Sequence, residues 1–208
     1  MNERKMSTRL LVTSAIITAL VVLLQAVGAS IKLGPFSISL VLIPIVIGTA
    51  TCGWKIGAWL GFVFGLMVLI SGDANLFLAV NVPGTIITVM VKGILAGLAA
   101  GLVYKLVAKF NRYIAVVSAA VVCPVVNTGI FLLGSVIFFM ETVNAGALAE
   151  GLSAGAYLII FFVGLNFVFE LLVNVVLSPA LARIIDIIGK RFVKTPEKPI
   201  VKSENNSQ

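Results

Sequence analysis

The sequence predicts an all-α integral membrane protein, a bundle of six transmembrane helices with its N and C termini in the cytoplasm. Of the 208 residues, 60% are hydrophobic and only 11% are charged, whereas soluble domains carry about 25% charged residues. The apolar residues also gather in long runs, and about 20 such residues let a helix cross the bilayer core. This composition excludes a water-soluble enzyme, a disordered chain and a disulfide scaffold.

Six apolar runs account for most of the chain. The first follows a basic start and is longer than the roughly 7–15-residue apolar core of a signal peptide, so an uncleaved helix is expected. The second and third are short and are separated by a break at residues 52–55. The sixth ends before Pro179, since proline interrupts helices, and a cytoplasmic continuation over residues 180–192 is expected. The predicted spans are residues 10–29, 36–51, 56–70, 82–107, 113–140 and 156–177.

The basic residues predict the orientation of this bundle. Cytoplasmic loops are enriched in lysine and arginine, and 13 of the 15 basic residues fall at the chain ends or in loops on that same side. Both termini are therefore predicted to be cytoplasmic, and the net charge of +7 needs no nucleic acid to explain it. We expect one domain over residues 1–192, without internal repeats, and a disordered cytoplasmic tail over the polar residues 193–208.

The sequence shows no set of residues for metal or catalytic chemistry. Histidine is absent, and Cys52 and Cys123 are 71 positions apart in apolar surroundings, which is typical of buried free thiols rather than of a metal motif. A P-loop, paired catalytic carboxylates and a serine–lysine pair are also missing. We therefore expect no catalytic residue, no metal and no cofactor in this chain.

Polar side chains inside the spans are the candidates for a binding site, because they are costly in lipid and usually face a cavity or a partner. Lys92 is the only cation within a span, and it either contacts a ligand or forms a structural pair with Glu170. Asn166, Glu170 and Asn174 recur every four residues and share one helix face. Of these, Asn166 is expected to face the ligand and Asn174 to be structural.

The fifth span and the outer loops add further candidates. Asn127 and Thr128 follow Pro124, and a proline within a span frees a backbone carbonyl, so this region is a candidate pocket wall. The loop over residues 71–83, which contains Asn81, and the loop over residues 141–155 mix polar and apolar residues. Such loops either fold back over the bundle or touch the lipid headgroups.

Small residues predict close packing between helices. Ala15 and Ala19 lie one turn apart in the first span and leave a shallow groove. Close contact of this kind drives helix association in lipid, where the hydrophobic effect between helices is lost. The glycines expected to pack the third span against the fourth are Gly57, Gly61, Gly65, Gly93, Gly97 and Gly101.

Together these features resemble the substrate-binding component, or S-component, of energy-coupling-factor (ECF) vitamin transporters. The resemblance spans about residues 6–192 and rests on the six-span plan, the Ala15-x-x-x-Ala19 spacing, and the run PVVNTGIF at residues 124–131. That run, and Asn166 followed by Glu170, look like the versions found in the pantothenate-type branch.

The resemblance implies the high-affinity binding subunit of an importer in a bacterial cell membrane, with a water-soluble vitamin, first of all pantothenate, as ligand. The implied partners are a transmembrane scaffold subunit, which we expect to dock at Ala15 and Ala19, and two cytoplasmic ATP-binding cassette ATPases. This chain is then not an enzyme itself. The implied pocket lies in the outer half of the bundle, and its candidate residues are Lys92, Asn127, Thr128, Asn166, Asn81, Lys32 and Glu170.

Other functions stay open at this point. An S-component for hydroxymethylpyrimidine or riboflavin is an alternative, although such ligands favour aromatic stacking. A stand-alone secondary carrier is another, and it would transport without ATP or partners. A channel is disfavoured because the inner halves of the spans are nearly all apolar.

Overall fold

The structure, a computed structural model, describes residues 8–29, 32–33, 36–37 and 40–193. Apart from its first residue, the tail predicted for residues 193–208 lies outside the described residues. In chain order the elements are α1 (Thr8–Gly28), β1 (Lys32–Leu33), β2 (Phe36–Ser37), α2 (Leu42–Cys52), α3 (Trp54–Ile70), α4 (Asn75–Leu78), α5 (Val82–Val107), α6 (Arg112–Phe138), α7 (Met140–Ala149), α8 (Ala154–Tyr157), the π-helix η1 (Leu158–Val163) and α9 (Gly164–Val193).

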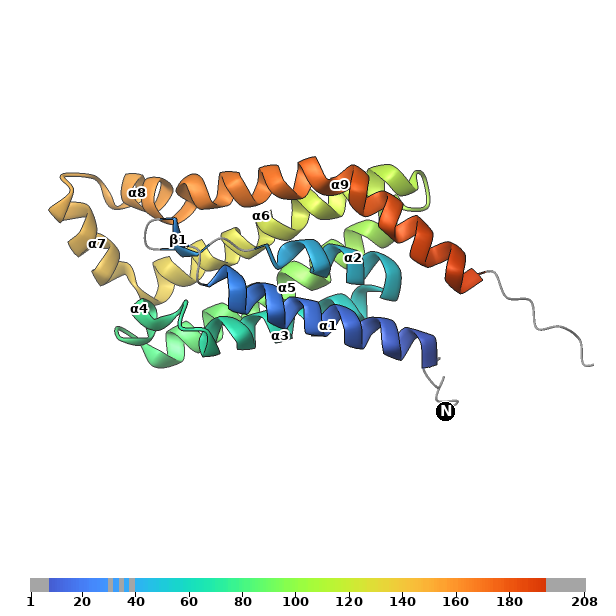
Figure 1. The fold of residues 1–208 in the computed structure, drawn as a ribbon. Helices are drawn as coiled ribbons and strands as arrows, with labels where there is room; N and C mark the ends of the chain where they lie inside the picture. Colours follow the sequence, from blue (N-terminus) through green and yellow to red (C-terminus); the bar gives the residue numbers. More distant parts are fainter. Residues whose placement is uncertain (1–7, 30–31, 34–35, 38–39, 194–208) are drawn as a thin grey trace, which may run out of the picture.

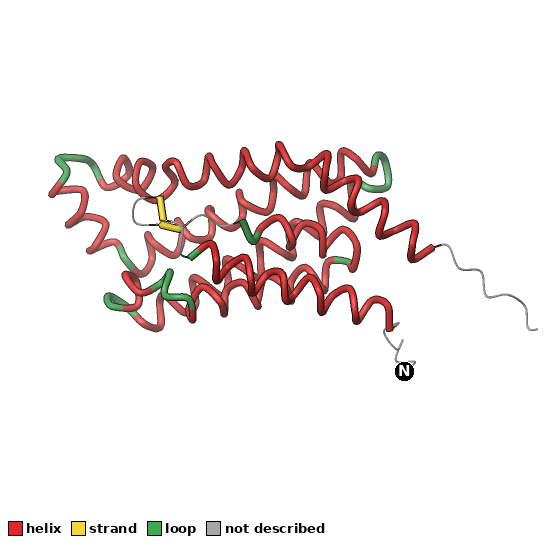
Figure 2. Tube along the Cα trace, in the orientation of Figure 1, coloured by secondary structure: helices red, strands yellow, loops and turns green. Residues whose placement is uncertain are grey.

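The long helices run along a common axis, and the start of α1 and the end of α9 lie at the same end of the molecule (Figure 1). The opposite end, called the distal end below, carries the β1–β2 pair, α4, α7 and α8. Figure 2 shows that the loops beside α4 and α7 also lie at this end. The strands pair antiparallel, with Lys32 opposite Ser37, and the rest of the described regular structure is helical, as predicted.

Several helices are suited to a membrane. Among the described residues, four helices are long and apolar enough to cross one, and five if α7 and residues 154–161, bent by 95°, count as one span. The four are α1, α5, α6 and the Phe167–Ile187 part of α9. The chain is therefore a multi-pass membrane protein by its helices, whereas the count of six spans and the cytoplasmic termini stay predictions.

The two remaining apolar helices are short. At about 1.5 Å per residue, the 11 residues of α2 and the 17 of α3 cover about 16 Å and about 25 Å of a hydrocarbon core of roughly 30 Å. Gly53, with φ of +94°, separates them, a left-handed backbone that glycine adopts without steric cost. The predicted break at residues 52–55 is thus confirmed.

Three sequence-based boundaries are wrong. The second span was expected to begin at residue 36, but residues 36–37 form β2 and the helix begins at Leu42. Residues 141–155 were expected to be a loop, yet α7 occupies Met140–Ala149, because alanine has the highest helix propensity and this stretch contains several. The continuation over residues 180–192 is confirmed, since α9 extends to Val193. The expected end of the sixth span before Pro179 is wrong, because the helix runs through that proline and its apolar part extends to Ile187.

The glycine prediction for α3 and α5 is confirmed. A Cβ added to Gly57 would lie 2.6 Å from the carbonyl oxygen of Gly97, and one added to Gly61 or Gly93 would overlap the other's backbone. Because side chains are absent at these positions, the two helices pack backbone against backbone. Such contact between small residues is the usual basis of helix association in membranes.

The short helix α2 lies at the centre of the bundle. It packs against α1, α3, α5, α6 and α9, and Leu42, Ile45 and Val46 are fully buried. Phe64 of α3 is fully buried in the same core. The core therefore surrounds α2, and the polar residues described next lie on the longer helices around it.

Candidate functional site

Lys92 lies in the interior of the bundle, on α5. It follows the first residue of that helix by ten positions, which places it about 15 Å from the distal end of α5. Its Nζ is 5.0 Å from the ring centroid of Phe131 on α6 and 5.8 Å from that of Phe64 on α3. Both distances suit cation–π attraction, so the ammonium group is held between the aromatic rings of two neighbouring helices.

A third and a fourth ring extend this arrangement toward the distal end. The ring of Phe77, on α4, meets Phe131 edge-on at 5.4 Å and Phe139 at 5.1 Å between centroids. We call Phe64, Phe77, Phe131 and Phe139 the aromatic cluster. Through Phe77, residues 71–81 fold back over the bundle, which is one of the two arrangements expected of an apolar loop.

Two carboxylates act on the Lys92 charge. Lys92 interacts electrostatically with Glu170 of α9 and with Asp73, which precedes α4. Glu170 is 3% exposed and also interacts with Cys123 of α6. Both roles expected for Lys92, contact with a ligand and a structural pair with Glu170, therefore stay predictions.

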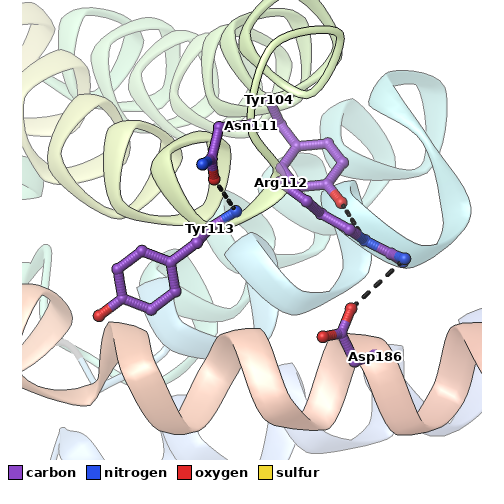
Figure 3. Close-up of polar contacts among 5 residues, drawn as sticks. All are labelled: Tyr104, Asn111, Arg112, Tyr113 and Asp186. Carbon is purple, nitrogen blue, oxygen red and sulfur yellow. Dashed lines mark hydrogen bonds and ion pairs between the residues drawn. The ribbon is translucent and has the colours of Figure 1, made fainter.

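An ion pair links α6 to α9 at the end of the molecule opposite the distal end (Figure 3). Arg112 Nη1, on α6, lies 3.3 Å from Asp186 Oδ1 of α9, and Arg112 Nε donates to the Tyr104 hydroxyl of α5 at 3.4 Å. The start of α6 is capped by Asn111, whose Oδ1 accepts from the backbone N–H groups of Tyr113 and Ile114. These contacts join α5, α6 and α9 at one point.

From that point the helix register brings Asn127 and Glu170 to the same depth. Asn127 is 15 residues after Arg112, and Glu170 is 16 residues before Asp186 on the antiparallel helix. At about 1.5 Å per residue, the two lie about 22 Å and about 24 Å from the ion pair. We call the polar residues near this level the polar layer. They are the half-buried Lys92 and the buried Thr88, Asn127, Glu170 and Asn174.

Three oxygens of the polar layer lack a hydrogen-bond partner among the described residues. They are Thr88 Oγ1, Asn127 Oδ1 and Asn174 Oδ1, and all three are buried. The Asn174 amide nitrogen, by contrast, donates to the Glu170 carbonyl at 2.8 Å, consistent with a structural role for that group. An unsatisfied buried polar atom costs about 1–3 kcal/mol, so a ligand carrying O–H or N–H donors has suitable acceptors here.

The other predicted residues have different surroundings. Asn81 is the N-cap of α5, and its Oδ1 accepts from the Gly84 backbone N–H at 3.0 Å, so this oxygen stabilises the helix start. Thr128 is half-buried on α6. Lys32 belongs to β1 and Asn166 to the first turn of α9, but both side chains lie outside the described ones.

Ala15 and Ala19 are exposed on α1. The buried stripe of that helix contains Ser14, Ile17, Val21, Gln25 and Gly28, and the two alanines lie beside it. Their groove therefore opens to the surface of the molecule and does not serve the interior packing of this chain.

Sequence reasoning missed three polar residues that the structure brings to the site. Thr88 precedes Lys92 by four residues and so shares its helix face, a signal that was available. Gln25 is the only amide side chain of α1 and is 2% exposed, a polar residue within a span of the kind that usually has a partner. Its partner, Asp73, is 48 residues away, and no local pattern links the two.

Comparison with known proteins gives one match. The model of the family described as "ECF transporter, substrate-specific component" matches residues 9–182. This range includes the whole aromatic cluster and the whole polar layer. No curated protein and no solved structure matches the chain.

Proposed function

Because the chain belongs to the family of substrate-specific components of ECF transporters, we propose that it binds a water-soluble vitamin with high affinity, and pantothenate first among these. As a member of that family it is a substrate-binding subunit of an ECF importer rather than an enzyme. The proposed site is formed by the polar layer and the aromatic cluster, in the half of the bundle nearer the distal end.

The observation that carries this proposal is the set of three buried oxygens of the polar layer that lack a hydrogen-bond partner among the described residues. Pantothenate offers a carboxylate, two hydroxyls and an amide N–H. Its carboxylate suits the Lys92 ammonium, because charge-assisted hydrogen bonds are the stronger ones. Its hydroxyl and amide donors suit Thr88 and Asn127, whose oxygens have no other partner among the described residues.

A second candidate ligand is an aromatic one such as hydroxymethylpyrimidine or riboflavin. The aromatic cluster favours it, since ring ligands stack against aromatic side chains and four phenylalanines lie around and above Lys92. The charges of Glu170 and Asp73 also offset that of Lys92, which weakens the attraction for an anion.

Calorimetry of the detergent-solubilised protein distinguishes these candidates. We expect pantothenate to bind the wild type and Asn127→Ala to lower its affinity. Asn111→Ala, at the N-cap of α6, is the control and should leave the affinity unchanged. Binding of hydroxymethylpyrimidine or riboflavin in place of pantothenate would select the second candidate. If no vitamin of a broad panel binds, the proposed ligand class is wrong.

The family also implies partnership with the scaffold and ATPase modules of an ECF transporter. We assign the scaffold contact to the α1 groove at Ala15 and Ala19, and ATP hydrolysis to two cytoplasmic ATPase subunits. With both termini in the cytoplasm of a bacterial cell, the distal end faces outside and captures the vitamin there. A stand-alone carrier would instead transport the vitamin into liposomes that contain this chain alone. Measuring vitamin uptake by such liposomes without ATP tests that alternative.

A further inference from the structure

A partly buried hydrogen bond joins α1 to the loop before α4. Gln25 lies on the buried face of α1, and its Nε2 donates to Asp73 Oδ2 and, at 3.5 Å, to the hydroxyl of Ser71. At 2% exposure the Gln25 side chain is shielded from solvent. A bond to a carboxylate in such surroundings is stronger than one between neutral groups, so it is a firm attachment between segments distant in sequence.

The attached loop covers the proposed site. Residues 71–81, the 71–81 segment below, are held at three places: by Gln25 at the start, by the contact of Phe77 with Phe131 and Phe139 in the middle, and by the Asn81 cap at the end. The last two contacts go to α5 and α6, which also carry the polar layer. The first goes to α1, a helix that contributes nothing to that layer.

The choice of an amide at position 25 has a chemical reason. A lysine or arginine there would neutralise Asp73, whereas glutamine orients the carboxylate and leaves its charge available. Asp73 interacts electrostatically with Lys92, and the Lys92 ammonium also touches the aromatic cluster. A neutral donor thus leaves Asp73 its charge, which acts on Lys92 in the same direction as that of Glu170.

We propose that Gln25 is a positioning residue for ligand binding, whose hydrogen bond to Asp73 keeps the 71–81 segment closed over the aromatic cluster and Lys92. The ligand in this inference comes from the proposed function. The hydrogen bond that holds the 71–81 segment does not depend on that function. Losing the bond should let the segment open more often, so that a bound ligand escapes faster and a free ligand enters at least as fast as in the wild type.

The first test needs no ligand and measures hydrogen–deuterium exchange of the 71–81 amides in the full chain. Gln25→Met, of similar length but without a donor, should speed exchange there by roughly tenfold. The matched control is Thr18→Val, because the Thr18 hydroxyl also joins α1 to α3, through Trp59 Nε1 at 3.3 Å, without touching the segment. Unchanged exchange in Gln25→Met, or an equal increase along every helix, would overturn the inference.

An isosteric exchange of the two partners tests the bond itself. Gln25→Glu places two carboxylates together and should also speed exchange in the 71–81 segment. Adding Asp73→Asn reverses donor and acceptor, since the new amide donates to the new carboxylate, and should restore protection. If the double variant stays as open as Gln25→Glu alone, the hydrogen bond is not what holds the segment.

The second test measures pantothenate binding by stopped-flow. Because the ligand enters and leaves past the same segment, Gln25→Met should raise the dissociation rate by roughly tenfold without lowering the association rate. The Gln25→Glu/Asp73→Asn pair should return both rates toward the wild-type values. Equal dissociation rates in wild type and Gln25→Met would overturn the positioning role. If pantothenate does not bind the wild type, the proposed ligand fails, and the exchange experiment alone decides whether Gln25 holds the segment.

Discussion

At the scale of single residues, Lys92 has the most unusual surroundings. A charged side chain inside a membrane is costly unless it finds partners, and Lys92 has two kinds: the rings of Phe64 and Phe131, and the charges of Glu170 and Asp73. The two rings approach the ammonium group without any ligand. These surroundings are compatible with both roles considered for Lys92. Loss of a ligand contact would lower binding affinity, whereas loss of a structural pair with Glu170 would lower stability.

Lys92→Ala separates the two roles. If Lys92 pairs directly with a ligand carboxylate, the variant should lose roughly 2–5 kcal/mol of binding free energy, measured by calorimetry with pantothenate. Lys105→Ala, an exposed position on the same helix, is the control and should bind normally. Unchanged affinity together with a lower melting temperature would instead make Lys92 a structural partner of Glu170.

Thr88 offers a second residue-scale test, because its hydroxyl is buried without a partner among the described residues. Thr88→Val replaces that hydroxyl by a methyl group of similar size, so thermal stability should stay the same or rise, while pantothenate affinity should fall by about 1 kcal/mol. The neighbouring Thr85 hydroxyl donates to the Asn81 carbonyl at 2.7 Å. Thr85→Val should therefore show the opposite pattern, with reduced stability and unchanged affinity, and equal behaviour of the two variants would contradict a ligand role for Thr88.

At the scale of elements, the α3–α5 contact is the most constrained. A Cβ on Gly61 would overlap the Gly93 backbone, whereas one on Gly129 of α6 meets no atom within 4 Å. Gly61→Ala should therefore force α3 away from α5 and lower the melting temperature in detergent, while Gly129→Ala should be neutral or stabilising, since alanine favours helix by up to about 1 kcal/mol. Similar melting temperatures for the two variants would show that α3 and α5 tolerate separation.

The sequence predicts those elements whose signal is local. The bounds of α5 follow from a continuous apolar run, and the α3–α5 contact follows from glycines four residues apart. The helix α7 was missed because its glycine and polar residues resemble those of a loop. The extent of α2 was overestimated because Phe36 and Ser37, at the predicted start of that span, pair with β1. Such pairing depends on a partner segment that hydropathy does not reveal.

The polar residues of the candidate site were predictable from the sequence, but its aromatic residues were not. Lys92, Asn127 and Glu170 were found because polar residues are rare within spans, and the structure brings them to one level of the bundle. The aromatic cluster and the Gln25–Asp73 bond were not found. Phenylalanine is common in any membrane helix, and only tertiary packing decides which rings face Lys92 and which carboxylate meets Gln25.

At the scale of the whole molecule, the proposed ligand site and the proposed scaffold contact are formed by different helices. The polar layer lies on α5, α6 and α9, while α1 lies beside α2 and α3 and exposes Ala15 and Ala19. The proposed ligand site and the proposed scaffold contact are thus on separate helices. They are connected through Gln25 and Asp73, and Gln25 lies about 9 Å along α1 from Ala19. Binding and assembly should accordingly be separable by mutation.

Ala15→Trp and Ala19→Trp test this separation. In lipid, helix association depends on close van der Waals packing between small side chains, and an indole would hold the scaffold helix away and remove most of those contacts. Both variants should lose ATP-driven vitamin uptake and co-purification with the scaffold, while the solubilised proteins bind pantothenate normally. Leu20→Trp is the control, because Leu20 is also exposed but lies about 100° around the helix from Ala19; it should assemble and transport. If the alanine variants assemble and transport as well, the scaffold docks elsewhere on the molecule.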